Sequence, residues 1–324
     1  MDDPRRIYDL LMDYVSTDTQ VTDVTIGLVW TVCKAQHMGL AMSPGMPTRT
    51  LPWPGTLVGK SLGELASWLT DWESYKATVG MAAINCSLNR YALPAGITLM
   101  PSTDNANLAV FDYFLPQLQG KKVVVVGRYP GIESYAEQTN LSLIERQPVA
   151  GDFPDPACEF LLPDADWVFL TASSITNKTF PRLAELAQHA ITVLMGPTVP
   201  WLPELHEFGI NYLAGVEVID SAKLYQTAAE GGGVRIFDNA VRYRIVDLTP
   251  DNSMTWLKSQ IGEDYAEKQR LNQAMENWYG SGKKGRFPAL SQLEQVTKKL
   301  SRMDSSYKRL WDRHAGKTFA QNTN

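Results

Sequence analysis

Two polar segments follow β-like runs of the sequence and contain residue types that bind ligands. Gly127-Arg-Tyr-Pro-Gly131 comes directly after Lys122–Val126, and a glycine at such a turn lets the backbone approach a ligand. Thr171–Thr179 contains five hydroxyl side chains, an amide and an ammonium. Such a segment can cap a helix or hold a polar ligand or an oxyanion. We expect anionic groups of a ligand to meet the backbone amides after Gly127 and around Asn177.

The turn at Gly127 differs from the dinucleotide-binding pattern Gly-x-Gly-x-x-Gly. Tyr129 and Ile132 occupy the second and third glycine positions, and the Tyr129 ring would crowd a pyrophosphate, so ordinary NAD binding is disfavoured. Glu145 lies 18 residues after Gly127 at the end of the next β-like run. An acid near this place holds ribose hydroxyls in dinucleotide-binding folds. Glu145 is therefore either a ribose-binding acid or a solvated carboxylate at a strand end.

A metal site is indicated only by Cys33 and His37, which are four residues apart. A thiolate and an imidazole suit a soft or borderline metal ion. The two residues form no complete ligand set, so a buried thiol beside a surface histidine is the preferred interpretation. The three cysteines include no Cys-x-x-Cys, which excludes a zinc ribbon and a thioredoxin motif. Nucleophile-elbow, P-loop and His-Glu-x-x-His motifs are also missing from the sequence, so familiar hydrolytic or phosphoryl-transfer chemistry is unsupported.

The polar segments are positioned by alternating β-like and helix-like stretches that begin near residue 105. The expected strands are 122–126, 141–145, 167–171, 191–195 and 211–214. Such alternation with short loops predicts an α/β fold with a doubly wound parallel sheet, whose ligands bind outside the carboxyl ends of the strands. The residues expected at the site are Gly127, Tyr129, Glu145, Ser173, Asn177, Thr179, Gly196 and Thr198, with Gly39 and Asn85 from the preceding domain.

Three regions are expected along the chain. Residues 1–104 should form a small α+β domain, in which a strand over 24–34 pairs with 39–43 and Ser61-Leu-Gly-Glu64 is a capping box that begins a helix. Residues 105–250 should form the Rossmann-like domain. Residues 251–324 have two apolar stripes at helical spacing, interrupted at Gly280-Ser-Gly282, which predicts a helical hairpin.

Composition and charge limit the function. Hydrophobic residues are 44% of the chain and charged residues 20%, which excludes a disordered or collagen-like protein. No apolar run approaches the roughly 20 residues of a membrane helix, and the polar start of the sequence shows no signal peptide, so we expect a cytoplasmic protein. The net charge of −5 argues against nucleic acid as the main partner.

The charge is unevenly distributed along the chain. Residues 251–324 contain 13 basic and 8 acidic residues, a balance of +5, whereas the first 250 contain 17 and 27, a balance of −10. We therefore expect the helical tail to dock on the acidic body of its own chain or of a neighbouring copy. A homo-oligomer through the C-terminal helices is one expected consequence.

The sequence resembles the family named "putative heavy-metal chelation", and the resemblance covers about residues 1–248. It is carried, in order, by Ile26-Gly-Leu-Val-Trp-Thr31, Gly39-Leu-Ala41, Gly80-Met-Ala-Ala-Ile-Asn85, Val125-Val-Gly-Arg-Tyr-Pro130, Glu145-Arg-Gln-Pro148, Gly151-Asp-Phe-Pro-Asp155, Ala165-Asp166, Asn177-Lys-Thr179, Gly196-Pro-Thr-Val-Pro200 and Gly215. The resemblance implies a Rossmann-like domain preceded by a domain similar to the N-terminal domain of enolase. It also implies a cleft between the two that suits a pterin-like, flavin-like or nucleotide-like ligand, and the handling of a heavy metal.

The expected function is the binding of a small polar ligand in that cleft, either a heavy metal or a metal-cofactor or pterin-like species. Two alternatives stay open. One is a Rossmann-type transferase or oxidoreductase with a nucleotide-like cofactor. The other is an assembly scaffold that acts through the C-terminal helices.

Overall fold

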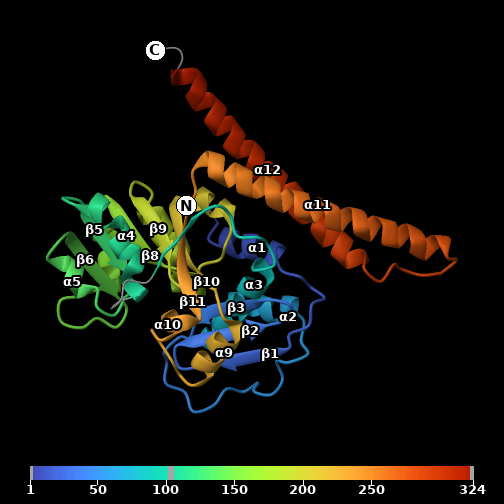
Figure 1. Ribbon diagram of the computed structural model, residues 1–324, viewed down its shortest axis with the longest axis horizontal. Helices are drawn as coiled ribbons and strands as arrows, with labels where there is room; N and C mark the ends of the chain where they lie inside the picture. The colour runs from blue at the N-terminus through green and yellow to red at the C-terminus, as the bar shows by residue number, and fades with distance from the viewer. Residues whose placement is uncertain (1–2, 101–105, 322–324) are drawn as a thin grey trace.

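The computed structural model describes residues 3–100 and 106–321. The chain forms a three-stranded antiparallel sheet, a larger mixed sheet of eight strands with helices around it, and a C-terminal pair of long helices (Figure 1). This arrangement confirms the predicted α/β class with a helical hairpin at the C-terminus. The boundary expected between residues 104 and 105 lies outside the described residues.

The N-terminal region begins with one helix and continues with the small sheet and two further helices. Its elements are α1 (Arg6–Asp13), β1 (Asp23–Ile26), β2 (Trp30–Lys34), β3 (Met38–Met42), α2 (Leu62–Ala66), η1 (Ser67–Thr70) and α3 (Ser74–Leu88). The Ser61 side chain accepts a hydrogen bond from the Glu64 N–H, so the predicted cap is confirmed. The single strand expected over 24–34 is wrong. The Gly27 N–H donates to the Trp30 carbonyl (3.0 Å), and this turn divides the segment into two antiparallel strands.

The larger sheet has the order β4-β11-β10-β9-β8-β5-β6-β7. Its strands are β4 (Ile97–Thr98), β5 (Lys122–Val126), β6 (Asn140–Glu145), β7 (Phe153–Pro154), β8 (Trp167–Thr171), β9 (Ile191–Met195), β10 (Ile210–Val218) and β11 (Val241–Asp247). The strands from β10 to β7 are parallel, whereas β11 and β4 pair antiparallel at one edge. The expected sheet was parallel throughout, and these two antiparallel strands were not predicted.

Short helices connect the strands of the larger sheet. They are η2 (Ala106–Leu108), α4 (Ala109–Leu118), α5 (Glu133–Ala136), η3 (Asp155–Ala157), α6 (Cys158–Leu161), α7 (Ser173–Thr176), α8 (Phe180–Leu186), η4 (Pro203–Phe208), α9 (Ser221–Ala229) and α10 (Ile236–Asn239). Alternate residues of β5 are buried on opposite faces of the sheet. Val124 and Val126 belong to one apolar cluster, and Val123 and Val125 to the other. This two-sided burial explains the continuous valine run.

The strand order reverses between β5 and β8. From β5 the chain proceeds to β6 and β7 on one side, and from β8 to β9 and β10 on the other. The helices that follow β5 and β8 therefore diverge, and the carboxyl ends of these two strands border a natural crevice. Ligands of open α/β sheets bind at such a switch point.

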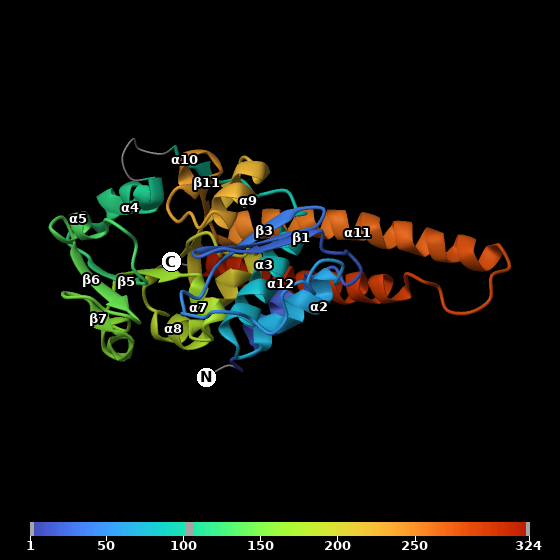
Figure 2. The same cartoon turned by 90° about the horizontal axis from the view of Figure 1, so that it is seen from below.

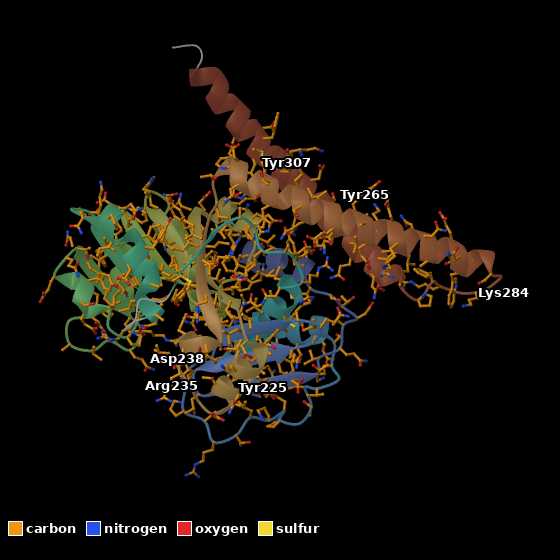
Figure 3. The ribbon with its side chains drawn as sticks, in the orientation of Figure 1. Tyr225, Arg235, Asp238, Tyr265, Lys284 and Tyr307 are labelled. Carbon is orange, nitrogen blue, oxygen red and sulfur yellow. The ribbon has the colours of Figure 1, made fainter. Side chains whose placement is uncertain are left out.

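The tail forms α11 (Pro250–Gly280) and α12 (Leu290–Gln321), which extend from the body as an arm (Figures 1 and 2). Lys284 lies at the far end of this arm (Figure 3). Lys298 and Arg302 of α12 pair with Asp13 of α1 at 2.8 and 2.5 Å, and Arg309 pairs with Glu207 at 2.5 Å. The expected docking of the basic tail on the acidic body is thus confirmed within one chain. Among the described residues, no helix combines the length and apolarity needed to cross a membrane.

A buried carboxylate lies close to this docking surface. Glu204 of η4 is 2% exposed, and its carboxylate accepts a hydrogen bond from the Tyr14 hydroxyl. Burial raises the pKa of Glu204 to about 7. The folded chain therefore binds more protons at this site than the unfolded chain between about pH 4.5 and pH 7, so the site makes folding less favourable as the pH rises through that window.

We predict that Glu204→Gln removes this pH dependence. At pH 8 the variant should be more stable than the unsubstituted protein by about 2 kcal/mol, because the amide need not be ionised in the buried site. Urea unfolding at pH 5 and pH 8 measures the difference, with the exposed Glu137→Gln as the matched control. Equal pH profiles for the unsubstituted protein and Glu204→Gln would show that Glu204 does not titrate in this range.

Candidate ligand-binding cleft

A cavity of about 900 Å³ opens at the carboxyl ends of β5, β6, β8 and β9. This volume is typical of a small-molecule site. Residues that follow the four strands form one wall. The opposite side is formed by the start of β2, the end of β3 with the residues next to them, and the region of α10, namely Val29, Trp30, Met42, Ser43, Pro44, Gly233, Val234 and Phe237. The cavity therefore lies between the N-terminal sheet and the switch point of the larger sheet.

Eight of the residues expected at the site line this cavity, although they come from four different strand ends. They are Gly127, Tyr129, Glu145, Ser173, Asn177, Thr179, Gly196 and Thr198. Gly39, Asn85, Cys33 and His37 do not line it. Asn85 lies behind the wall instead. Its side-chain amide donates to the carbonyls of Leu40 (2.8 Å) and Thr198 (3.0 Å), so it fixes the loop after β9 against β3.

The strand ends approach one another closely because glycines occupy the tight positions. Gly127 has a φ of +99°, and a Cβ there would lie 2.9 Å from the Thr171 methyl group. Gly196 has a φ of +105°, and a Cβ there would lie 3.5 Å from the Tyr129 hydroxyl. The Thr198 hydroxyl accepts a hydrogen bond from the Met42 N–H (2.9 Å), so it joins the loop after β9 to β3.

Glu145 occupies the turn that was expected to bind an anion. Its carboxylate accepts hydrogen bonds from the backbone N–H groups of Arg128 (2.8 Å), Arg146 (2.8 Å) and Gln147 (3.2 Å). The prediction that an anionic group meets the backbone amides after Gly127 is therefore wrong for the first of these amides, because the Glu145 carboxylate already accepts from it. Both oxygens of Glu145 are engaged in the turn, which leaves this acid a structural part of the cavity wall.

The amides around Asn177 are also engaged, because the polar segment after β8 contains the short helix α7. The N–H groups of Asn177, Lys178 and Thr179 donate to the carbonyls of Ser173, Ile175 and Ser174. The expectation that an anionic group of a ligand meets these amides is therefore wrong, because backbone carbonyls already accept from them. Several hydroxyls are likewise satisfied within the segment: Ser174 donates to the Thr171 carbonyl, and Thr176 to that of Ser173.

Lys178 is one of several cavity residues that the candidate set from the sequence omitted. Among the described residues it is the only non-glycine with a positive φ, +64°, a conformation that carries local strain. Lys178 lines the cavity, and its ammonium donates to the Thr176 carbonyl (3.0 Å) and interacts with the Asp71 carboxylate only at longer range. Burial lowers the pKa of Lys178 to about 8. The ammonium in the Thr171–Thr179 motif was the sequence signal for it, but its backbone conformation is visible only in the structure.

Aromatic side chains form much of the cavity wall. Trp30, Tyr129, Phe237 and Tyr243 all line it, and the Phe237 and Tyr243 rings stack with centroids 4.8 Å apart. Burial raises the pKa of both tyrosines, so their phenols stay protonated near neutral pH and can donate hydrogen bonds. Flat aromatic surfaces with phenol donors suit a planar heterocyclic ligand.

The charged residues of the wall differ in how far they are neutralised. Arg128 pairs with Asp152 (2.6 Å) and Glu133, and Arg182 pairs with Glu159 (2.5 Å) and Glu185 (2.8 Å). Lys178 and Arg146 also line the cavity, and among the described residues they interact with carboxylates only at longer range, Lys178 with Asp71 and Arg146 with Asp155. These two cations are therefore less neutralised than Arg128 and Arg182, and an anionic group of a ligand can pair with them.

The described residues do not supply a ready metal centre. No group of three or more His, Cys, Asp or Glu side chains among them is arranged to hold a metal ion. Cys158 is the one cysteine that lines the cavity. Burial and the neighbouring Asp155 and Glu159 raise its thiol pKa to about 11, so it is protonated at neutral pH and is a weak metal ligand in that form.

Comparison with known proteins places the chain in a family. The sequence model of the DUF364 family, described as "Putative heavy-metal chelation", matches residues 109–247, and that of DUF4213, with the same description, matches residues 8–88. A crystal structure of a DUF364-family protein of unknown function from Desulfitobacterium hafniense is 30% identical, with a TM-score of 0.64. The match covers 75% of this chain and 98% of that one.

A second DUF364-family structure, from Pyrococcus horikoshii, is 21% identical with a TM-score of 0.61. This match covers 75% of this chain and 99% of that one, and it shows the shared fold. No curated protein matches the chain. Residues 251–324 lie outside both family matches. The protein belongs to the DUF364 family, whose description points to heavy-metal chelation.

Proposed function

We propose that the cleft binds a planar, polar small molecule of the pterin-like or nucleotide-like class that carries an anionic group. The observation that carries this proposal is that Lys178, whose half-buried ammonium has only the more distant Asp71 as a partner of opposite charge among the described residues, lines an aromatic-walled cavity. An ammonium that burial has partly desolvated gains more from an anionic partner than one in water. Trp30, Tyr129 and Tyr243 supply the surfaces and donors for a flat ring system.

A heavy metal fits this proposal as part of the bound ligand. The family description supports metal handling, whereas the described residues around the cavity bring no three protein donors together. If an organic ligand holds the metal, the protein has to recognise only the organic ligand and supplies no metal ligand itself. The cleft would then bind a metal-cofactor species through its organic part.

A matched pair of probes tests the proposal. Calorimetric titration with pterin-6-carboxylate and with unsubstituted pterin compares ligands that share a ring system and differ in the anionic group. Adenosine monophosphate and adenosine form a second pair. Zinc and cadmium chloride test the metal alone. We expect the anionic member of at least one pair to bind at 1:1 stoichiometry, about 10-fold or more tighter than its neutral partner.

Two results would contradict the proposal. One is the absence of binding of every organic probe to the folded protein. The other is equal affinity for the charged and neutral members of each pair, since Lys178 would then have no part in recognition. Stoichiometric binding of a metal salt alone, lost on substitution of cavity residues, would replace the organic ligand with a bare ion.

A further inference from the structure

One edge of the larger sheet has exposed apolar side chains. β7 is the last strand at this edge, and the chain continues from it through η3 into α6. Val149, Phe153 and Phe160 are 54%, 43% and 78% exposed. Full burial of a phenylalanine side chain is favourable by about 1.5–3 kcal/mol, and exposed apolar side chains that gather in one place are typical of an interaction surface. We call residues 149–164 the β7 edge.

The β7 edge is negatively charged. Its 16 residues include four acidic residues and no basic residue. Two of the four carboxylates pair with arginines of the same chain. Asp155 and Asp164 are exposed, and Arg146 acts on Asp155 only at longer range. The edge therefore presents negative charge beside apolar side chains.

The turn between α11 and α12 has the opposite charge. Residues 278–288, which we call the arm tip, contain three basic residues and no acidic residue. The basic residues are Lys283, Lys284 and Arg286, and all three are exposed. Arg286 approaches the exposed Glu294 at 3.6 Å. Tyr279 is 49% exposed, so the arm tip also combines charge with an aromatic surface.

The β7 edge and the arm tip lie at opposite ends of the longest axis of the molecule. Figures 1 and 2 show the strands of this side of the sheet at one end and the turn between the long helices at the other, and Lys284 marks the tip in Figure 3. The 31 residues of α11 span about 46 Å. Because the Debye length is only about 8 Å at physiological ionic strength, the β7 edge does not neutralise the tip of its own chain.

We propose that the arm tip binds the β7 edge of a second copy of this chain, in a closed dimer with two such contacts. A copy turned end for end places its tip at the edge of the first copy and its edge at the tip of the first. One two-fold axis relates the two contacts, and this symmetry is the commonest among soluble homo-oligomers. Once one contact has formed, the second is intramolecular, so two small contacts act together.

The two surfaces complement each other in charge and in apolar character. In the dimer the tip cations face the carboxylates of Asp155 and Asp164, which gives the contact its orientation. Tyr279 packs on the exposed Phe153 and Phe160, and an aromatic pair contributes about 0.5–1.5 kcal/mol beyond the area that it buries. A nucleic acid or an anionic lipid surface would pair with the tip but leave both phenylalanines uncovered. A second copy occupies both surfaces at once.

Sedimentation equilibrium of the full-length protein at about 1–200 µM tests the proposal, since contacts of this size are weak. The mass should rise with concentration to twice the 36.1 kDa of one chain and stop there. Lys283→Glu with Lys284→Glu should weaken the dimer about 10-fold or more, and so should Asp155→Lys with Asp164→Lys. A chain with all four substitutions should dimerise again, because both surfaces are reversed.

The matched control is Lys121→Glu with Lys258→Glu, which changes the net charge equally at exposed positions outside both surfaces. It should dimerise like the unsubstituted protein. Carbodiimide cross-linking of mixed unlabelled and nitrogen-15-labelled chains needs no variant. Because it joins an ammonium directly to a carboxylate, we expect cross-links between the tip lysines of one isotope and residues 149–164 of the other.

Several results would overturn the proposal. They are a monomer at every concentration, masses above two chains, and a dimer that the tip and edge substitutions leave unchanged. A monomer whose tip lysines bind single-stranded DNA or vesicles of anionic phospholipid would assign the tip to another polyanion. These experiments contain no cleft ligand, so their outcome is independent of the binding proposed for the cleft.

Discussion

Asp264→Ala should lower the free energy of unfolding by about 3–5 kcal/mol, because it removes the anion from a buried charge cluster. Asp264 of α11 is 0% exposed. Its carboxylate pairs with Lys299 of α12 at 2.9 Å and with Arg90, and it accepts a hydrogen bond from the Tyr91 hydroxyl at 2.9 Å. The side chain of Lys299 is only 5% exposed. Without Asp264 this ammonium stays buried with no counterion.

An exposed pair in the same hairpin provides the control. Asp304 and Lys308 are 2.7 Å apart on the solvent side of α12, and such pairs contribute about 0.3–0.5 kcal/mol. Asp304→Ala should therefore change stability by less than about 0.5 kcal/mol. Guanidinium unfolding of the two variants makes the comparison. Equal effects would mean that the hairpin is not held to the body through Asp264.

Lys178→Asn should weaken binding of the anionic probe by about 10- to 100-fold, since a hydrogen bond to a charged group contributes about 1.5–3 kcal/mol. Asparagine suits the test because it tolerates a positive φ, and Lys178 has a φ of +64°. The variant should therefore stay folded while it loses the ammonium. Calorimetric titration against the exposed Lys121→Asn measures the effect. Similar losses for the two variants would show that Lys178 makes no specific contact.

The same lysine predicts the direction of a pH effect. Burial lowers the pKa of Lys178 to about 8, so raising the pH through that value removes its charge. Affinity for the anionic probe should then fall in the unsubstituted protein. Lys178→Arg, which keeps its charge over this range, should bind with a much flatter profile. A flat profile in the unsubstituted protein would separate Lys178 from recognition of the anion.

Much of the larger sheet could be predicted from sequence, because its central strands are buried on both faces. Lys122–Val126, Trp167–Thr171 and Ile191–Met195 are continuous apolar or β-branched runs, and the strands match them in full. Val241–Asp247 was missed because Arg242 and Arg244 interrupt its apolar residues. Alternation that includes long cationic side chains does not distinguish such a strand from a loop.

The cavity was located correctly at the strand ends, but its chemistry depends on long-range contacts. The register of β5 and β6 pairs Val126 with Ile144, which places Glu145 beside the turn at Gly127. No spacing rule reveals that this carboxylate then occupies the Arg128 amide. The surroundings of Cys33 and His37 were missed for a similar reason. Gly39, which lies opposite Cys33 in the small sheet, packs on α3 at Cys86, and the Cys86 thiol donates to the His37 carbonyl (3.0 Å).

A crystal structure of the protein soaked with the tightest-binding anionic probe tests the central claim most directly. The proposal predicts difference density for a flat ring in the cleft beside Trp30 and Tyr243, with the anionic group within hydrogen-bond distance of the Lys178 nitrogen. An empty cleft, with the probe bound on the hairpin or elsewhere on the surface, would contradict it. So would a probe seated in the cleft with its anionic group directed away from Lys178.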